Sequence, residues 1–232
     1  SYGAFADPLT GGHLFAPGLW QNGAVSPLST GAIAEDLAHA WYAGEGALHP
    51  SLGMTQPNAD KPLAYSWSKA PRLDGQPVEV GALARQLISG QPLIRALHAR
   101  HGSTVAVRVV ARLVELARIA LAMDGWLRLI DPRDIFCTPF EAPSGPPFRG
   151  VGLVEAARGG LGHWLELREG RLAHYQVIAP TTWNFSPRDA AGQPGPLEAA
   201  LVGTPVEAGA TSPVAVQHVV RAFDPCMACT VH

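Results

Sequence analysis

The most regular stretch of the sequence is VAVRVVARLVELARI, residues 105–119. Its polar side chains recur at steps of four, three and three, which places them in one stripe along a helix: Arg108, Arg112, Glu115 and Arg118. The other positions are apolar, so we expect most of the circumference to be buried against this chain or another. Ser103 is a candidate N-cap. The charged stripe leaves no run of about 18 uncharged apolar residues, which argues against a membrane-spanning segment.

Helical patterning also extends toward the N-terminus. Apolar periodicity runs over 78–129 and is interrupted at SGQP, residues 89–92, and at HGS, residues 101–103, so three helices are predicted. A short helix is predicted over 36–42. By contrast, the prolines of 47–77 indicate an irregular but ordered loop.

Toward the C-terminus the hydrophobic period changes to two. Residues 163–168 and 171–178 alternate around the turn signal Glu169-Gly170, which predicts a β-hairpin. A polar loop is expected over 179–195, followed by helical turns over 197–202 and 213–223.

The N-terminal residues 1–34 combine glycine, proline and isolated aromatic residues, and they predict short strands and turns. Together with the helices and the hairpin, they make the predicted fold class α+β, mainly helical, with long ordered loops.

The composition excludes several classes of function. Hydrophobic residues make up 47% of the 232 residues and charged residues 16%, which is typical of a packed globular chain. The net charge is −2, and only Lys61 and Lys69 are lysines among 17 basic residues. The chain therefore offers no basic field for nucleic acid. Three cysteines are too few for a disulfide-built scaffold.

A potential metal-binding motif closes the sequence: DPCMACTVH, residues 224–232. The spacing of Cys226, Cys229 and His232 brings two thiolates and an imidazole to one side of a helical turn. Soft sulfur ligands favour nickel, iron, copper or zinc over magnesium. A structural zinc half-site, a redox dithiol or two buried cysteines would suit the same spacing.

Two loops carry polar residues that could serve a site. Arg158 precedes the glycine-rich residues 159–162, where the backbone can approach a ligand and a guanidinium can donate to it. The segment PTTWN, residues 180–184, directly follows the predicted hairpin. The alternative interpretations are a surface turn with a solvated arginine and an ordinary turn capped by asparagine or threonine.

The terminal motif resembles the C-terminal signature of nickel-iron hydrogenase large subunits, in which the chain ends at that histidine after a maturation protease removes a tail. Further blocks are similar to the family and follow one another in family order. They are LHP (48–50), YSWSKAPR (65–72), EVGALAR (79–85), GGLGHW (159–164), YQ (175–176), PTTWN (180–184) and SPRDA (186–190). The resemblance implies that residues 1–232 form a single unit, the C-terminal part of a large subunit.

The resemblance also implies metal ligands. Cys226 would be a terminal nickel ligand and Cys229 would bridge nickel and iron, with carbonyl and cyanide completing the iron. His232 and the backbone carbonyl of Ile178 would belong to a separate buried cation site, usually magnesium. The family's iron-sulfur clusters lie in the partner small subunit.

Other residues are implied to surround the metals. Arg158 would hang over the open metal position, and Asp224 would pair with it or orient it. Either the guanidine or Cys226 would be the first base in heterolytic hydrogen cleavage. Thr181, Thr182 and the backbone near Ala157 would donate to cyanide or shape its pocket.

The sequence departs from the family pattern in two places. The family supplies its other two cysteines from an Arg-x-Cys-Gly-x-Cys motif, which is absent here together with an acidic ligand of the cation site and a proton-relay glutamate. Cys137 cannot replace that pair. Ala157 stands where the family usually has proline, which affects the cyanide pocket and leaves the metal ligands in place.

The expected function is that of an enzyme part, a hydrogenase cleaving H2 reversibly into protons and electrons. It would need an N-terminal half, carried on a separate chain if not on this one, and an iron-sulfur small subunit, after processing by maturation factors and the C-terminal protease. The expected location is cytoplasmic or membrane-associated. The alternative is a non-catalytic relative, either a maturation scaffold for the iron fragment or a metal-binding remnant.

Overall fold

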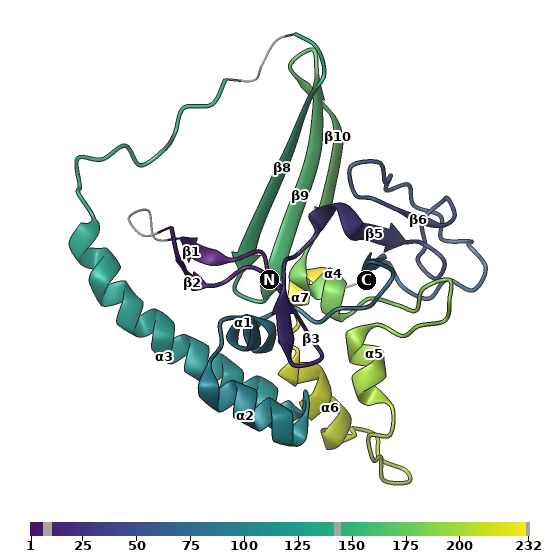
Figure 1. Ribbon diagram of the computed structural model, residues 1–232. Coiled ribbons are helices and arrows are strands. Elements are labelled where there is room, and N and C mark those ends of the chain that lie inside the picture. The colour runs from purple at the N-terminus through teal and green to yellow at the C-terminus, as the bar shows by residue number, and fades with distance from the viewer. Residues whose placement is uncertain (7–10, 142–144, 231–232) are drawn as a thin grey trace.

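The computed structural model describes residues 1–6, 11–141 and 145–230 (Figure 1). Its helices are α1 (Ala82–Ile88), α2 (Pro92–His101), α3 (Val105–Leu129), α4 (Pro180–Asn184), α5 (Pro196–Leu201), α6 (Val214–Ala222) and α7 (Met227–Thr230), with one 3-10 turn at Thr30–Ala32. Its strands are β1 (Ala4–Ala6), β2 (His13–Phe15), β3 (Leu19–Gln21), β4 (Ala24–Ser26), β5 (Ile33–Asp36), β6 (Ala47–Leu48), β7 (Ala70–Leu73), β8 (Phe148–Ala156), β9 (Gly159–Arg168) and β10 (Arg171–Ile178).

The strands form small antiparallel sheets. Two are the hairpins β1-β2 and β3-β4, a third has the order β6-β5-β7, and the largest has the order β10-β9-β8. The predicted hairpin is confirmed as β9-β10, and β8 adds a strand that the sequence analysis missed. The fold class is therefore mixed α+β. The expectation of a mainly helical chain is not confirmed.

The three predicted helices between 78 and 129 are confirmed as α1, α2 and α3. The N-cap of α3 is Thr104, whose hydroxyl accepts from the backbone N–H of Val107, and not the predicted Ser103. None of the helices formed by the described residues combines the length and apolarity that crossing a bilayer requires.

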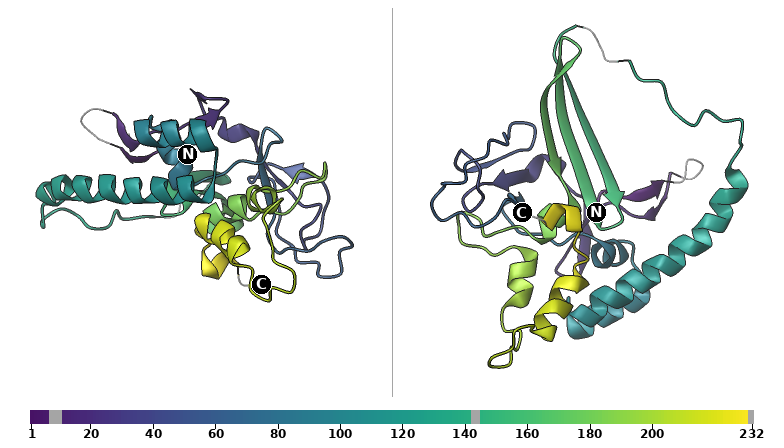
Figure 2. Two further views of the ribbon diagram at one scale, coloured as in Figure 1. Left: turned by 90° about the horizontal axis from the view of Figure 1, so that it is seen from below. Right: turned by 180° about the vertical axis from the view of Figure 1, so that it is seen from behind.

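The polar stripe of α3 faces the body of the protein. Arg108 and Glu115 are each 7% exposed, whereas Leu113 and Leu116 on the opposite face are 60% and 65% exposed. Each buried charge has a partner, because Arg108 pairs with Glu79 at 2.8 Å and Glu115 pairs with a buried arginine of α1. Figures 1 and 2 show α3 running along one edge of the molecule, and its apolar side chains divide between the core, with Val107 and Ala111, and the exposed side, with Leu113 and Leu116.

The prediction of a short helix over 36–42 is wrong. There β5 ends at Asp36, and the chain turns because Asp36 Oδ1 accepts from the backbone N–H of Ala38 at 2.8 Å. Lys61 Nζ then donates to the carbonyl of Leu37 at 2.6 Å and to those of Tyr42 and Gly44. These contacts engage backbone groups that a helix would bond internally.

The predicted polar loop over 179–195 begins instead with a helix, α4. Pro180 occupies the first turn of α4, where its missing N–H costs nothing. The helical turns predicted farther along are confirmed as α5 and α6, and the short strands and turns predicted for 1–34 are confirmed as β1 to β4.

Two clusters form the core. One lies between the large sheet, β5, β7 and α4 and contains Ile33, Leu73, Trp164, Ile178 and Trp183. The other joins α1, α2 and α3 and contains Leu83, Leu87, Ile94, Val107 and Ala111. The first cluster thus packs segments from both halves of the chain against one another.

A glycine in this core gives a test of the packing. A Cβ on Gly195 would lie 1.9 Å from the backbone oxygen of Ser186, so Gly195→Ala is expected to lower the free energy of unfolding by ~3 kcal/mol or more. Gly125 in α3 has open space, so Gly125→Ala is the control and is expected to raise it by up to ~1 kcal/mol. Chemical denaturation of both variants measures the difference; equal midpoints would contradict the packing.

Candidate functional site

Three segments that are far apart in sequence meet at the predicted site. Cys226 directly precedes α7 and Cys229 lies within it, Thr181 lies in α4, and Arg158 lies in the turn between β8 and β9. The backbone N–H of Cys226 donates to Thr181 Oγ1 at 3.2 Å. Arg158 Nε lies 3.6 Å from Asp224 Oδ2, just before the cysteines. The structure therefore brings these five predicted residues together.

The two thiols differ in acidity. The Cys229 thiol donates a hydrogen bond to the Cys226 sulfur, which lowers the pKa of Cys226, and nearby backbone N–H groups and the positive charge of Arg158 lower it further. Burial raises the pKa of Cys229, and the interaction with Cys226 raises it again. Cys226 is therefore the more acidic of the two thiols, and a bound cation would lower the pKa of both.

Arg158 and Asp224 form a half-exposed ion pair, at 40% and 39% side-chain exposure. Arg158 Nε itself is buried and has no hydrogen-bond partner among the described residues. Asp224 has a φ of 53°, the left-handed region that a non-glycine residue rarely adopts. The pair sits beside the thiols, since the charge of Arg158 lowers the pKa of both.

The residues expected near cyanide lie close to the thiols. Thr181 is 2% exposed, and its hydroxyl forms a hydrogen bond that lowers the pKa of Cys229. Thr182 follows it in α4 and is half-buried. The carbonyl of Ala157 accepts from Arg85 Nη2 at 2.9 Å, and this hydrogen bond fixes the backbone at Ala157.

The predicted cation site is described only in part. Ile178 is fully buried at the end of β10, and His232 lies outside the described residues. The sequence analysis missed a buried polar cluster on the same face of β10, in which Gln176 Nε2 donates to Glu35 Oε2 at 2.8 Å and Lys69 lies 3.8 Å from that carboxylate. Burial raises the pKa of Glu35 and lowers that of Lys69.

No local sequence pattern marks this cluster, because its members come from three separate strands or strand ends. The available signals were that Lys69 is one of only two lysines in the chain and that Lys69 and Gln176 lie in the family-like blocks 65–72 and 175–176.

The third cysteine lies elsewhere. Cys137 is exposed in the connection between α3 and β8, which Figure 1 shows far from α7. Among residues 1–6, 11–141 and 145–230, no three histidine, cysteine or acidic side chains cluster as a metal would require. Two thiolates with a hydroxyl donor and a guanidinium nearby fit half of a soft-metal site whose other ligands come from elsewhere.

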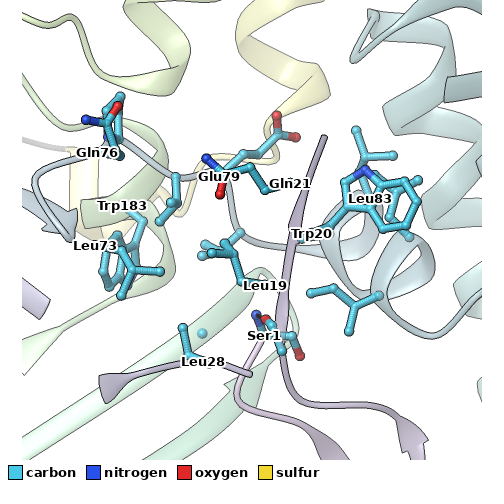
Figure 3. Close-up of a pocket in the computed structure, with 18 of the residues that line it drawn as sticks. Ser1, Leu19, Trp20, Gln21, Leu28, Leu73, Gln76, Glu79, Leu83 and Trp183 are labelled. Atoms are coloured by element: carbon cyan, nitrogen blue, oxygen red, sulfur yellow. Dashed lines mark hydrogen bonds between the residues drawn. The ribbon is translucent and has the colours of Figure 1, made fainter. Parts of the chain in front are cut away.

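A large pocket lies apart from the cysteines, Thr181 and Arg158. Figure 3 shows this hollow of about 640 Å³, lined by Leu19, Trp20, Leu73, Leu83 and Trp183 among others. It holds none of the residues predicted to bind or surround the metals. A smaller hollow of about 230 Å³ is lined by Thr181 and Cys229 and by Glu198 of α5.

Comparison with known proteins identifies the relationship. The family model described as nickel-dependent hydrogenase matches residues 4–232. The chain is 35% identical to the periplasmic [NiFeSe] hydrogenase large subunit of Desulfomicrobium baculatum, covering 94% of this chain and 46% of that protein. It is 33% identical to the hydrogenase-2 large chain of Escherichia coli strain K12, covering 97% and 46%.

The structural comparison agrees. The Ni-Fe-Se hydrogenase from D. vulgaris Hildenborough in the reduced state superposes with a TM-score of 0.89 and 35% identity, over 99% of this chain and 51% of that one. The chain thus spans about half the length of the relatives it matches. Sequence and fold together confirm the predicted resemblance: the chain belongs to the nickel-dependent hydrogenase family.

Proposed function

We propose that this chain supplies one half of the nickel-iron site of a hydrogenase that cleaves H2 reversibly and heterolytically into protons and electrons. The observation that carries the proposal is the meeting of Cys226, Cys229, Thr181 and Arg158 from three distant segments. Their arrangement fits a soft metal with an open side, and the relatives are hydrogenase large subunits by name.

In this proposal the sulfurs of Cys226 and Cys229 would hold the nickel-iron centre, whose iron would also carry carbonyl and cyanide. The bound centre would supply the Lewis acidity and redox capacity that H2 cleavage needs. The cysteine sulfurs hold it by thiolate donation, and the hydroxyl of Thr181 fixes the direction of the Cys229 sulfur.

The remaining polar groups manage charge and protons. Cys226 Sγ and the Arg158 guanidine are the two candidates for the first proton acceptor, and the lowered pKa of the thiol favours holding Cys226 as a thiolate. Asp224 neutralises the guanidinium beside it. Thr182 and the backbone at Ala157 line the cyanide side.

The carbonyl of Ile178 and the imidazole of His232 are proposed to hold Mg²⁺ near the C-terminus. The buried position of Ile178 at the end of β10 supports an ordered backbone ligand there. Removal of a C-terminal tail by a maturation protease, with other maturation factors, would precede closure of this site.

The chain is proposed to act as one unit, the C-terminal part of a large subunit. An N-terminal half would bring the second cysteine pair, and a small subunit with iron-sulfur clusters would carry electrons. The exposed leucines of α3, Leu113, Leu116, Leu121 and Leu127, support a large interface with such a partner.

Metal analysis of the native complex tests the proposal. We expect nickel and the iron that lies outside the iron-sulfur clusters in equal amounts, infrared bands of carbonyl and cyanide, and a mapped peptide that carries the second cysteine pair. Iron without nickel would contradict the enzyme and favour the maturation scaffold.

A further inference from the structure

The orientation of the Arg158 guanidinium is only weakly set by its own contacts. Its Nε is 3.6 Å from Asp224 Oδ2, longer than a hydrogen bond, and finds no other partner among the described residues. Ala157 and Arg158 form a two-residue hairpin turn, yet neither has the positive φ typical of the turns favoured at this length. The guanidinium therefore depends on whatever holds the backbone of the turn.

Arg85 of α1 holds that backbone. Its Nη1 donates to the carbonyl of Ala156 at 3.1 Å, and its Nη2 donates to the carbonyl of Ala157 at 2.9 Å. Arg85 is itself 2% exposed and bonded to two carboxylates, Glu115 at 2.8 and 2.5 Å and Glu155 at 2.8 Å. All five N–H groups of this guanidinium are thus engaged, which fixes its plane.

The close approach of the turn to α1 has its own requirement in the backbone. A Cβ on Gly159 would lie 2.7 Å from the nitrogen of Gly81, the N-cap of α1, and a Cβ on Gly81 would lie 3.0 Å from the oxygen of Arg158. Only glycine at both positions lets the turn lie within reach of Arg85.

The other member of the ion pair, Asp224, is held from α3, the helix that also carries Glu115. Arg112 Nη2 of α3 donates to the carbonyl of Ala222 at 2.7 Å, the last residue of α6. Arg108 lies over the ring of Phe223 at 4.0 Å. Together these contacts tie the helix end to α3, two residues before Asp224 adopts its left-handed conformation.

We propose that the polar stripe of α3 sets the geometry of the Arg158–Asp224 pair. Glu115 acts through Arg85, which clamps the turn that carries Arg158, and Arg112 anchors the segment that carries Asp224. Arg85 and Arg112 are positioning residues in this scheme. The scheme rests on the proposed function, since the pair is assigned to hydrogen cleavage there.

The test is Arg85→Lys in the assembled hydrogenase. Lysine keeps the charge but cannot bond two carboxylates and two carbonyls at once. We expect kcat to fall about 10- to 100-fold, because small displacements of a reacting group have effects of that size. Nickel, iron and KM should stay unchanged. Amide hydrogen exchange in the peptide spanning 155–161 should accelerate at least tenfold, a readout that does not need turnover.

A double-variant cycle separates positioning from general damage. If Arg85 acts through Arg158, the Arg85→Lys/Arg158→Lys enzyme should be no slower than Arg158→Lys alone. The matched control is Arg72→Lys, because Arg72 is 3% exposed and also makes five hydrogen bonds, to groups outside the turn. Any fall in kcat caused by Arg72→Lys should multiply with the fall caused by Arg158→Lys when the two are combined. Arg112→Lys with Asp224→Asn forms the second cycle.

An unchanged kcat in Arg85→Lys, unchanged amide exchange at 155–161, or losses that multiply in the double variant would overturn the proposal. If Arg85→Lys does not assemble, Glu155→Gln weakens the same clamp at constant shape and is expected to lower kcat about 3- to 10-fold. A native complex without nickel overturns the proposed function instead, and the exchange measurement then still tests the clamp.

Discussion

Cys229→Ser in the assembled hydrogenase is expected to lose nickel and iron and to lower H2 turnover at least ~1,000-fold, because nickel prefers a soft thiolate and a serine hydroxyl stays protonated at neutral pH. Thr181 contacts both cysteines, because its hydroxyl accepts from the backbone N–H of Cys226 and bonds the Cys229 sulfur, so Cys229→Ser also changes that contact. Metal content per chain, determined together with a hydrogen-uptake assay, measures the effect.

Cys137→Ser is the control for this experiment. Cys137 is exposed and lies outside the site, so its replacement should leave metal content and turnover within a factor of two of the native values, ~0.4 kcal/mol. A Cys229→Ser enzyme that keeps a full complement of nickel would show that the bridging assignment is wrong.

Arg158→Lys is expected to lower kcat by about 100- to 10,000-fold, the range over which a positioned proton-transfer or charge-stabilising group usually acts. A lysine ammonium has the same charge but lacks the planar fork of guanidinium, so it cannot occupy the same place beside Asp224 and the thiols. Nickel and iron content and the infrared bands of the iron ligands should stay unchanged, because Arg158 binds neither metal in this scheme.

Arg149→Lys provides a matched control on β8, the strand that leads into the turn of Arg158, since Arg149 is 67% exposed and pairs with Glu166 away from the thiols. We expect it to retain native kcat. If Arg158→Lys also turned over at the native rate with full metal content, the guanidinium would have no part in the reaction. Loss of nickel in that variant would instead assign Arg158 a structural role.

Much of the local structure could be predicted from the sequence. Periodicity placed α1, α2, α3 and the β9-β10 hairpin, because a helix or a hairpin is stabilised by side chains within a few residues of one another. The same reasoning failed at 36–42, where a lysine about 20 residues farther along takes the backbone carbonyls. It also missed β8, whose pairing partner lies across a turn that lacks the usual signal.

The candidate site, too, could be predicted from the sequence only in part. The spacing of Cys226 and Cys229 indicated a soft-metal half-site, and the ordered blocks indicated the family, because both are properties of the linear sequence. The tertiary structure alone decided that Thr181 bonds the backbone of Cys226 and that Arg158 stands beside Asp224. These contacts join positions between 45 and 66 residues apart, beyond the reach of any local pattern.

The stripe of charges on α3 shows most clearly what each level determined. The sequence by itself established that Arg108, Arg112 and Glu115 share one face of a helix. Only the fold decided that this face is buried, because a charge can leave water when oppositely charged or hydrogen-bonding partners from other segments meet it. Arg85 and Glu79 are those partners here, and through Arg85 the stripe reaches the turn that carries Arg158.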